Sequence, residues 1–179
     1  MEFRSTKLRD AYLIELAPAY DSRGFFARTF CTEEFAAHQL EVNFPQHSVS
    51  FSARRGTVRG MHFQREPGAE VKLVRCIQGA ILDVIIDIRP DSPTYRHWQL
   101  FELTAANRRQ LYIPKGFAHG FQTLSDDVEV SYLISTPYRP DLASGIRYND
   151  PAFGITWPLS VTGISEKDLR WPDFPKQIS

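Results

Sequence analysis

Short apolar runs separated by prolines and glycines dominate this sequence, and they constrain its fold more than any other feature. Such runs are typical of β-strands joined by turns, because an amphipathic helix needs a longer periodic stretch. Residues 80–88 (AILDVIIDI) are the clearest example, since apolar side chains occupy most positions on both faces of a strand with a period of two. We therefore expect this strand to be buried on both sides.

Further strands are expected at residues 71–77, 98–103, 109–113 and 128–135, with few helices. Thr32 is a candidate N-cap for a short helix over residues 32–39, and Ser165 for another at residues 165–168. The chain from Trp171 onward contains two prolines and is expected to be irregular. This order predicts an all-β sandwich or barrel, and 179 residues suit one domain spanning residues 1–179.

The charge balance and the cysteines restrict the partners and the compartment. Lys plus Arg equals Asp plus Glu at 21 each, so no net field favours nucleic acid or an anionic membrane surface. No leader peptide and no apolar run near the ~18 residues of a membrane span is present. Cys31 and Cys76 are expected to be free thiols, so we expect a soluble cytoplasmic protein with neither a nucleic-acid nor a membrane partner.

Two segments place a histidine beside a glycine turn: residues 59–64 (RGMHFQ) with His62, and residues 114–121 (PKGFAHGF) with His119. A lone histidine is more often structural, but the second segment resembles a motif of the cupin barrels, which hold ligands in their lumen. Cupin metal sites usually start from a His-x-His pair. That pair is missing here, so we expect no metal site from the scattered His38, His47, His62, His97 and His119.

Nine segments, in their order and spacing, resemble the dTDP-4-dehydrorhamnose 3,5-epimerase family over about residues 21–168. They are residues 23–26 (RGFF), 59–64 (RGMHFQ), 72–75 (KLVR), 83–89 (DVIIDIR), 92–94 (SPT), 109–121 (RQLYIPKGFAHGF), 149–151 (NDP), 157–158 (WP) and 165–168 (SEKD). The resemblance implies a cupin-type jelly-roll β-barrel with a few short helices, and a homodimer. It also implies cofactor-free proton removal beside the C4 ketone of a nucleotide-diphosphate 4-keto-6-deoxyhexose.

The resemblance assigns three catalytic residues. His62 matches the base, Asp168 the carboxylate that orients it, and Tyr132 the proton donor on the other face of the sugar. A ketone acidifies its neighbouring C–H bonds, so an imidazole with its ordinary pKa of about 6.5 suits the base, and positioned proton transfer contributes about 10²–10⁴-fold. From the residues alone, Tyr132 would more simply be core packing, and Asp168 would cap or form an ion pair near a C-terminal helix.

Further positions match substrate-binding residues of the family. Lys72 and Arg59 are candidates to stabilise the negative charge that enolate formation puts on the C4 oxygen. Tyr138 matches the residue that stacks on the nucleotide base. The remaining matches, some of which would hold the diphosphate, are Arg23, Gln46, His119 and Lys167. Without the resemblance, these basic side chains would be read as ordinary solvated surface.

Three binding positions differ from the family pattern. Arg28 stands where Glu is usual, Ser48 where Asn is usual and Ala143 where Glu is usual. We therefore expect an epimerase acting at C3, C5 or both, on a dTDP-, CDP- or other NDP-sugar, within a pathway that makes deoxysugars for a polysaccharide or glycosylated metabolite. The alternatives are a 3-epimerase or 5-epimerase only, a non-catalytic cupin that binds a nucleotide sugar, and a metal-dependent cupin oxygenase.

Overall fold

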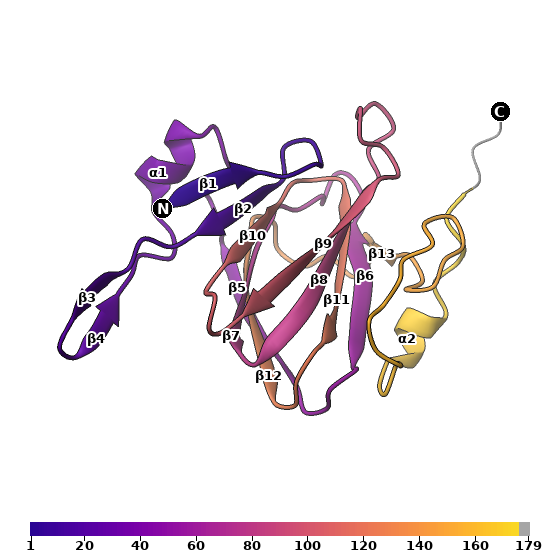
Figure 1. The fold of residues 1–179 in the computed structure, drawn as a ribbon. Helices are drawn as coiled ribbons and strands as arrows, with labels where there is room; N and C mark the ends of the chain where they lie inside the picture. Colours follow the sequence, from indigo (N-terminus) through magenta and orange to yellow (C-terminus); the bar gives the residue numbers. More distant parts are fainter. Residues whose placement is uncertain (176–179) are drawn as a thin grey trace.

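Two antiparallel sheets form most of the computed structural model, which describes residues 1–175 (Figure 1). The six-stranded sheet has the order β1 (Glu2–Ser5), β2 (Tyr12–Glu15), β10 (Gln110–Ile113), β7 (Lys72–Gln78), β12 (Val128–Ile134) and β5 (Gln46–Ser52). The five-stranded sheet has the order β13 (Ala143–Gly145), β6 (Val58–Gln64), β11 (Phe117–Thr123), β8 (Ala80–Asp87) and β9 (Trp98–Thr104). The expected all-β fold is therefore confirmed.

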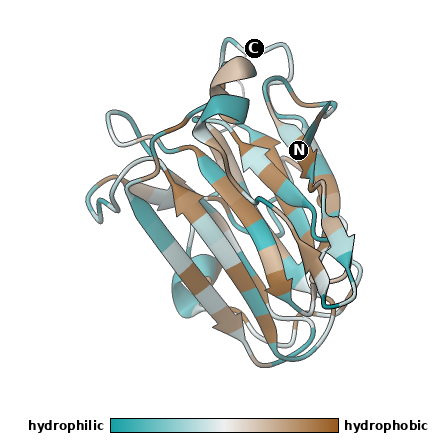
Figure 2. Ribbon diagram, turned by 90° about the vertical axis from the view of Figure 1, so that its left-hand side faces the viewer, coloured by the Kyte–Doolittle hydropathy of each residue, from teal (hydrophilic) through white to brown (hydrophobic). Residues whose placement is uncertain are grey.

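The main core lies between the two sheets. Val74 and Leu111 of the six-stranded sheet and Ile85 and Phe121 of the five-stranded sheet belong to one buried cluster. Figure 2 shows the alternation of hydrophobic and hydrophilic residues along the strands that produces this inner face. Each fully buried aliphatic or aromatic side chain contributes about 1.5–3 kcal/mol, so this inner cluster is the main source of the barrel's stability.

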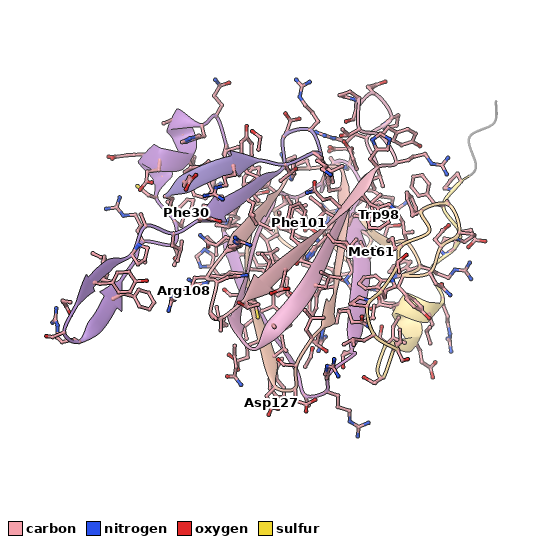
Figure 3. The ribbon with its side chains drawn as sticks, in the orientation of Figure 1. Phe30, Met61, Trp98, Phe101, Arg108 and Asp127 are labelled. Carbon is pink, nitrogen blue, oxygen red and sulfur yellow. The ribbon has the colours of Figure 1, made fainter. Side chains whose placement is uncertain are left out.

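The five-stranded sheet is also covered on its outer face. Val84 and Ile86 of β8 pack there with Met61, and the chain that follows β13 covers them with residues such as Phe153. Figure 3 labels Met61 in this outer cluster and Phe101 in the inner one. Strand β8 is thus buried on both faces, as its sequence predicted.

Residues 1–175 also contain two short helices, which test the predicted N-caps. Helix α1 (Thr32–Ala37) is shorter than expected, and its N-cap is Cys31, which lies in the extended region and makes no side-chain cap hydrogen bond. Thr32 is already helical, so its prediction as the cap is wrong. Helix α2 (Glu166–Leu169) is capped by Ser165, whose Oγ accepts a hydrogen bond from the Asp168 backbone N–H, as predicted.

A small hairpin of β3 (Ala19–Asp21) and β4 (Gly24–Phe26) projects from the barrel beside β2 (Figure 1). It carries exposed aromatic side chains, of which Tyr20 and Phe26 are 68% and 78% exposed. The Arg108 guanidinium lies 4.2 Å from the Phe25 ring centroid, in a cation–π contact. Within residues 1–175, no helix is both long enough and apolar enough to cross a membrane.

Candidate active site

A cavity of about 650 Å³ opens between the two sheets at the side of β5, β6 and β13. It is bounded by β7 and β12 of one sheet, by β11 of the other, and by the segment around α2. Most of the predicted site residues line this cavity: Gln46, Ser48, Arg59, His62, Lys72, His119, Tyr132, Tyr138, Lys167 and Asp168. Ala143, the third substituted position, lines it as well.

His62 and Asp168 form a short hydrogen bond between His62 Nε2 and Asp168 Oδ1, at 2.6 Å. Burial opposes ionisation of Asp168, but hydrogen bonds from His62, Gly60 and Trp171 outweigh it and hold the pKa of the carboxyl below its ordinary value. An ionised carboxylate can only accept, so the imidazole Nε2 must carry the hydrogen. The neutral ring then presents its lone pair on Nδ1, which is the atom that can take a proton.

The backbone around Gly60 allows strands β6 and β11 to lie close together. Gly60 has a φ of +115°, and a Cβ there would lie 2.5 Å from Gly120 Cα on β11. The Gly60 N–H donates to Asp168 Oδ2 at 3.3 Å. Glycine is therefore required two residues before His62, because any side chain would separate β6 from β11.

His119 lies opposite His62 in the register of β11 and β6, and it forms a second histidine–carboxylate pair. Its Nε2 lies 2.9 Å from Oδ2 of Asp83, a fully buried residue of β8. Burial raises the pKa of Asp83, against the opposing effects of His119 and Lys72. Asp83 was not predicted as a site residue, although a carboxylate in an otherwise apolar buried strand was the available signal.

Lys72 points into the cavity from β7 and is held by a carboxylate. Its Nζ lies 2.9 Å from Glu70 Oε1 and donates to the His62 carbonyl at 3.4 Å. Gln64 fixes Glu70 in turn, by donating to Glu70 Oε2 at 2.9 Å. An ammonium has three N–H bonds, so among the described contacts one remains for a ligand. Glu70 and Gln64 were not predicted, because their role depends on side-chain contacts.

Tyr132 faces the cavity from β12, on the sheet opposite to that of His62. Its hydroxyl makes a 3.0 Å hydrogen bond with Ser50 Oγ. Burial raises the pKa of Tyr132, although the hydrogen bond with Ser50 lowers it in part. The phenol therefore remains protonated, and can donate, across the neutral pH range.

The other predicted binding residues form the rim of the cavity. Arg59 donates from Nε to Ser52 Oγ at 2.9 Å and from its terminal nitrogen to the Phe51 carbonyl at 2.6 Å. Gln46 Oε1 accepts a hydrogen bond from the Tyr138 N–H at 3.0 Å, which ties the start of β5 to the segment after β12. These contacts hold the Arg59 and Gln46 side chains in place at the wall of the cavity.

Arg23 and Arg28 lie outside the cavity of their own chain. Arg23 is at the turn of the β3–β4 hairpin, where its guanidinium pairs with Asp21 at 2.6 Å and is 87% exposed. Arg28 follows β4 and donates to Glu34 Oε1 at 3.1 Å. Arg23 and Arg28 were predicted to lie with the other site residues. Within one chain they do not, because the hairpin projects from the barrel.

Among residues 1–175, no three His, Cys, Asp or Glu side chains are grouped so that they could hold a metal ion. The two cysteines are free, as expected, with Cys76 buried and Cys31 partly exposed.

Comparisons with known proteins agree with this geometry. The family model of dTDP-4-dehydrorhamnose 3,5-epimerase matches residues 5–176. Proteins of that name from Sinorhizobium fredii and Methanothermobacter thermautotrophicus are 44% and 46% identical, over 97% and 95% of this chain and 90% and 94% of their own lengths. The crystal structure of the Bacillus anthracis protein of that name, with TDP and PPi bound, has a TM-score of 0.94 and 42% identity, covering 97% of this chain and 99% of that one. The chain belongs to the dTDP-4-dehydrorhamnose 3,5-epimerase family, with its cupin-type fold.

Proposed function

We propose that this protein epimerises a nucleotide-diphosphate 4-keto-6-deoxyhexose by removing and returning a proton beside the C4 ketone. The observation that carries the proposal is the placement of the His62–Asp168 pair and the Tyr132 hydroxyl on opposite sheets of one cavity. Inversion is served by a base on one side of the sugar and an acid on the other, since the proton leaves from one face and returns to the opposite face.

In this mechanism His62 Nδ1 takes the proton from the carbon next to the ketone. Asp168 stabilises the imidazolium that forms, because its carboxylate accepts the Nε2 hydrogen at 2.6 Å. The charge that develops on the C4 oxygen lies within reach of the Lys72 ammonium, which Glu70 holds in place. Tyr132 then delivers a proton to the opposite face, and no cofactor or metal takes part in any step.

The substrate carries a nucleotide diphosphate at the rim of the cavity. Arg59 and Lys167 offer cations for the diphosphate, and Tyr138 offers an exposed ring, 54% accessible, for stacking on the base. Ser48 and Ala143 line the same cavity with side chains smaller than the family usually has. The nucleotide could thus be dTDP, CDP or another NDP, and the inverted carbon C3, C5 or both.

We also propose that residues 1–179 act as one domain, in the cytoplasm, as a homodimer. The exposed Tyr20 and Phe26 on the projecting hairpin support the dimer, because solvent-exposed aromatic clusters mark interaction surfaces. In such a dimer the hairpin would bring Arg23 and Arg28 to the partner's cavity. Light scattering should then give twice the 20.6 kDa mass of one chain.

The decisive experiment is NMR of a panel of 4-keto-6-deoxysugar nucleotides incubated with the enzyme in heavy water. Deuterium at C3, C5 or both, together with inversion, is the expected result and gives the regiochemistry. The matched control is His62→Ala, which should bind the sugar without exchange. Binding without any deuterium incorporation by the wild type would instead identify a non-catalytic nucleotide-sugar-binding protein.

A further inference from the structure

Two N–H groups converge on one oxygen of the catalytic carboxylate. His62 Nε2 lies 2.6 Å from Asp168 Oδ1, and the indole Nε1 of Trp171 donates to the same oxygen at 3.2 Å. The other oxygen, Oδ2, accepts from the Gly60 N–H. The terminal torsion of an aspartate is broad, so one hydrogen bond alone leaves the carboxylate plane free to turn. The Trp171 and Gly60 donors hold both oxygens and thereby fix that plane.

The indole is itself held in place by the strand next to His62. Gly145 of β13 lies opposite His62 in the register with β6, and the Trp171 ring occupies the space above it. A Cβ at Gly145 would lie 2.4 Å from Cε2 and from Nε1 of the indole. On the ring's π face, Lys167 Nζ lies 5.3 Å from the centroid. The ring therefore packs directly against backbone, which leaves little freedom for its N–H to point elsewhere.

We propose that Trp171 is a positioning residue of the epimerase, whose indole N–H holds the Asp168 carboxylate in the orientation that aims His62 at the sugar. The inference rests on the proposed function, because it assigns Trp171 a role in the same proton transfer. Trp171 acts through Asp168 and not by touching the reacting carbon. Its indole N–H is therefore the group whose removal should slow turnover.

The first test is Trp171→Phe, which keeps an aromatic ring over Gly145 and removes the N–H. The expected result is a fall in kcat of about three- to tenfold, the effect of one ordinary hydrogen bond, because two of the three donors to the Asp168 carboxylate remain. KM should change by less than about twofold, since the ligand contacts stay. The matched control is Trp157→Phe, which removes an indole hydrogen bond to the Tyr148 carbonyl at 2.8 Å, away from the cavity. Its kcat should equal that of the wild type.

The second test is a double-mutant cycle with Asp168→Ala. If Trp171 works through the carboxylate, Trp171→Phe should slow the Asp168→Ala enzyme by no more than about 1.5-fold, because no carboxylate is left to orient. An equal loss in both backgrounds would overturn the proposal. So would an unchanged kcat with raised KM in Trp171→Phe, which would identify the ring as a wall of the ligand site only.

The third test moves the indole without removing its N–H. Gly145→Ala should push the ring away from Asp168, and we expect a kcat loss similar to that of Trp171→Phe with a normal circular dichroism spectrum. Full activity in Gly145→Ala would contradict the proposal. Failure of the inference is distinguishable from failure of the proposed function, because the latter would appear as absence of deuterium exchange in the wild-type enzyme itself.

Discussion

Tyr132→Phe should separate the proposed catalytic role of the phenol from its structural role. The ring keeps its apolar contacts with the inner core, so only the 3.0 Å hydrogen bond with Ser50 is lost. Ser50 is partly exposed, and water can replace the missing partner. We therefore expect the free energy of unfolding to fall by only about 0.5–1.5 kcal/mol. Loss of a positioned acid should slow inversion far more, by about 10²–10⁴-fold.

NMR in heavy water measures the two half-reactions separately. Tyr132→Phe should still exchange protons at the carbon facing His62, since the base is intact, but it should give little inverted product. Ser50→Ala is the matched control, because it removes the same hydrogen bond and leaves the phenol in place. That variant should keep inversion within about threefold of the wild type, because it loses one neutral hydrogen bond and no proton donor.

An unchanged rate of inversion in Tyr132→Phe would refute the reasoning and assign protonation to water or another acid. The pH dependence gives an independent check of the same residue. Because burial raises the pKa of Tyr132, the phenol should not lose its proton near the ordinary value of about 10. The rate of inversion by the wild type should therefore not decrease below about pH 10 through loss of the Tyr132 proton. Any decrease in that range should also appear in Tyr132→Phe.

Four further results are expected. His62→Ala should abolish deuterium exchange at every sugar carbon while substrate binding persists in calorimetry, and Asp168→Asn should cost less because the base remains. Activity should survive exhaustive chelation, and elemental analysis should find no stoichiometric metal. Dissociation constants for dTDP, UDP, CDP and GDP should reveal no simple dTDP preference. A tenfold preference for dTDP would mean that Arg28, Ser48 and Ala143 do not change which nucleotide the protein prefers. Burial opposes ionisation of Asp87, yet hydrogen bonds from Arg89 and two hydroxyls outweigh it and hold its pKa below the ordinary value. Asp87→Asn should therefore lower the free energy of unfolding by roughly 2–4 kcal/mol at pH 7. In denaturant titrations this difference should disappear as the pH falls below about 4, because the wild-type carboxylate is then protonated.

Much of the barrel could be predicted because its central strands carry their burial in the sequence. Apolar residues on both faces of β8 required cover on both sides, and the structure supplies it from the second sheet and from the chain after β13. Strands β1 to β4 were missed because each is only three or four residues long, and β1, β3 and β4 are largely exposed, so their hydrophobic pattern is weak. Strands β5, β6 and β13 were not predicted either. These strands form because they pair with neighbouring strands, and such pairing cannot be read from a short stretch of sequence.

The candidate site, like the barrel, could be predicted from the sequence only in part. His62, Tyr132 and Asp168 could be named from the family resemblance, and His62 and Asp168 lie within the segments that carry it. Asp83 and Trp171 could not, because their contacts depend on how β8 and the segment after α2 pack against β11 and β13. Asp83 lies 36 residues from His119 along the chain. Trp171 is only three residues from Asp168, but the position of its ring depends on the space left by the missing side chain of Gly145.

The projecting hairpin has a consequence for how the protein can diverge. Residues 19–28 contribute nothing to the three buried clusters of the described chain, and Arg28 contacts only exposed or partly exposed groups. Substitutions there carry almost no penalty for the barrel, whereas those at Gly60 or Asp83 disturb buried contacts. Sequence change in the hairpin is therefore decoupled from the stability of the barrel, so the proposed contacts of Arg23 and Arg28 with a partner's cavity can change while the fold is kept.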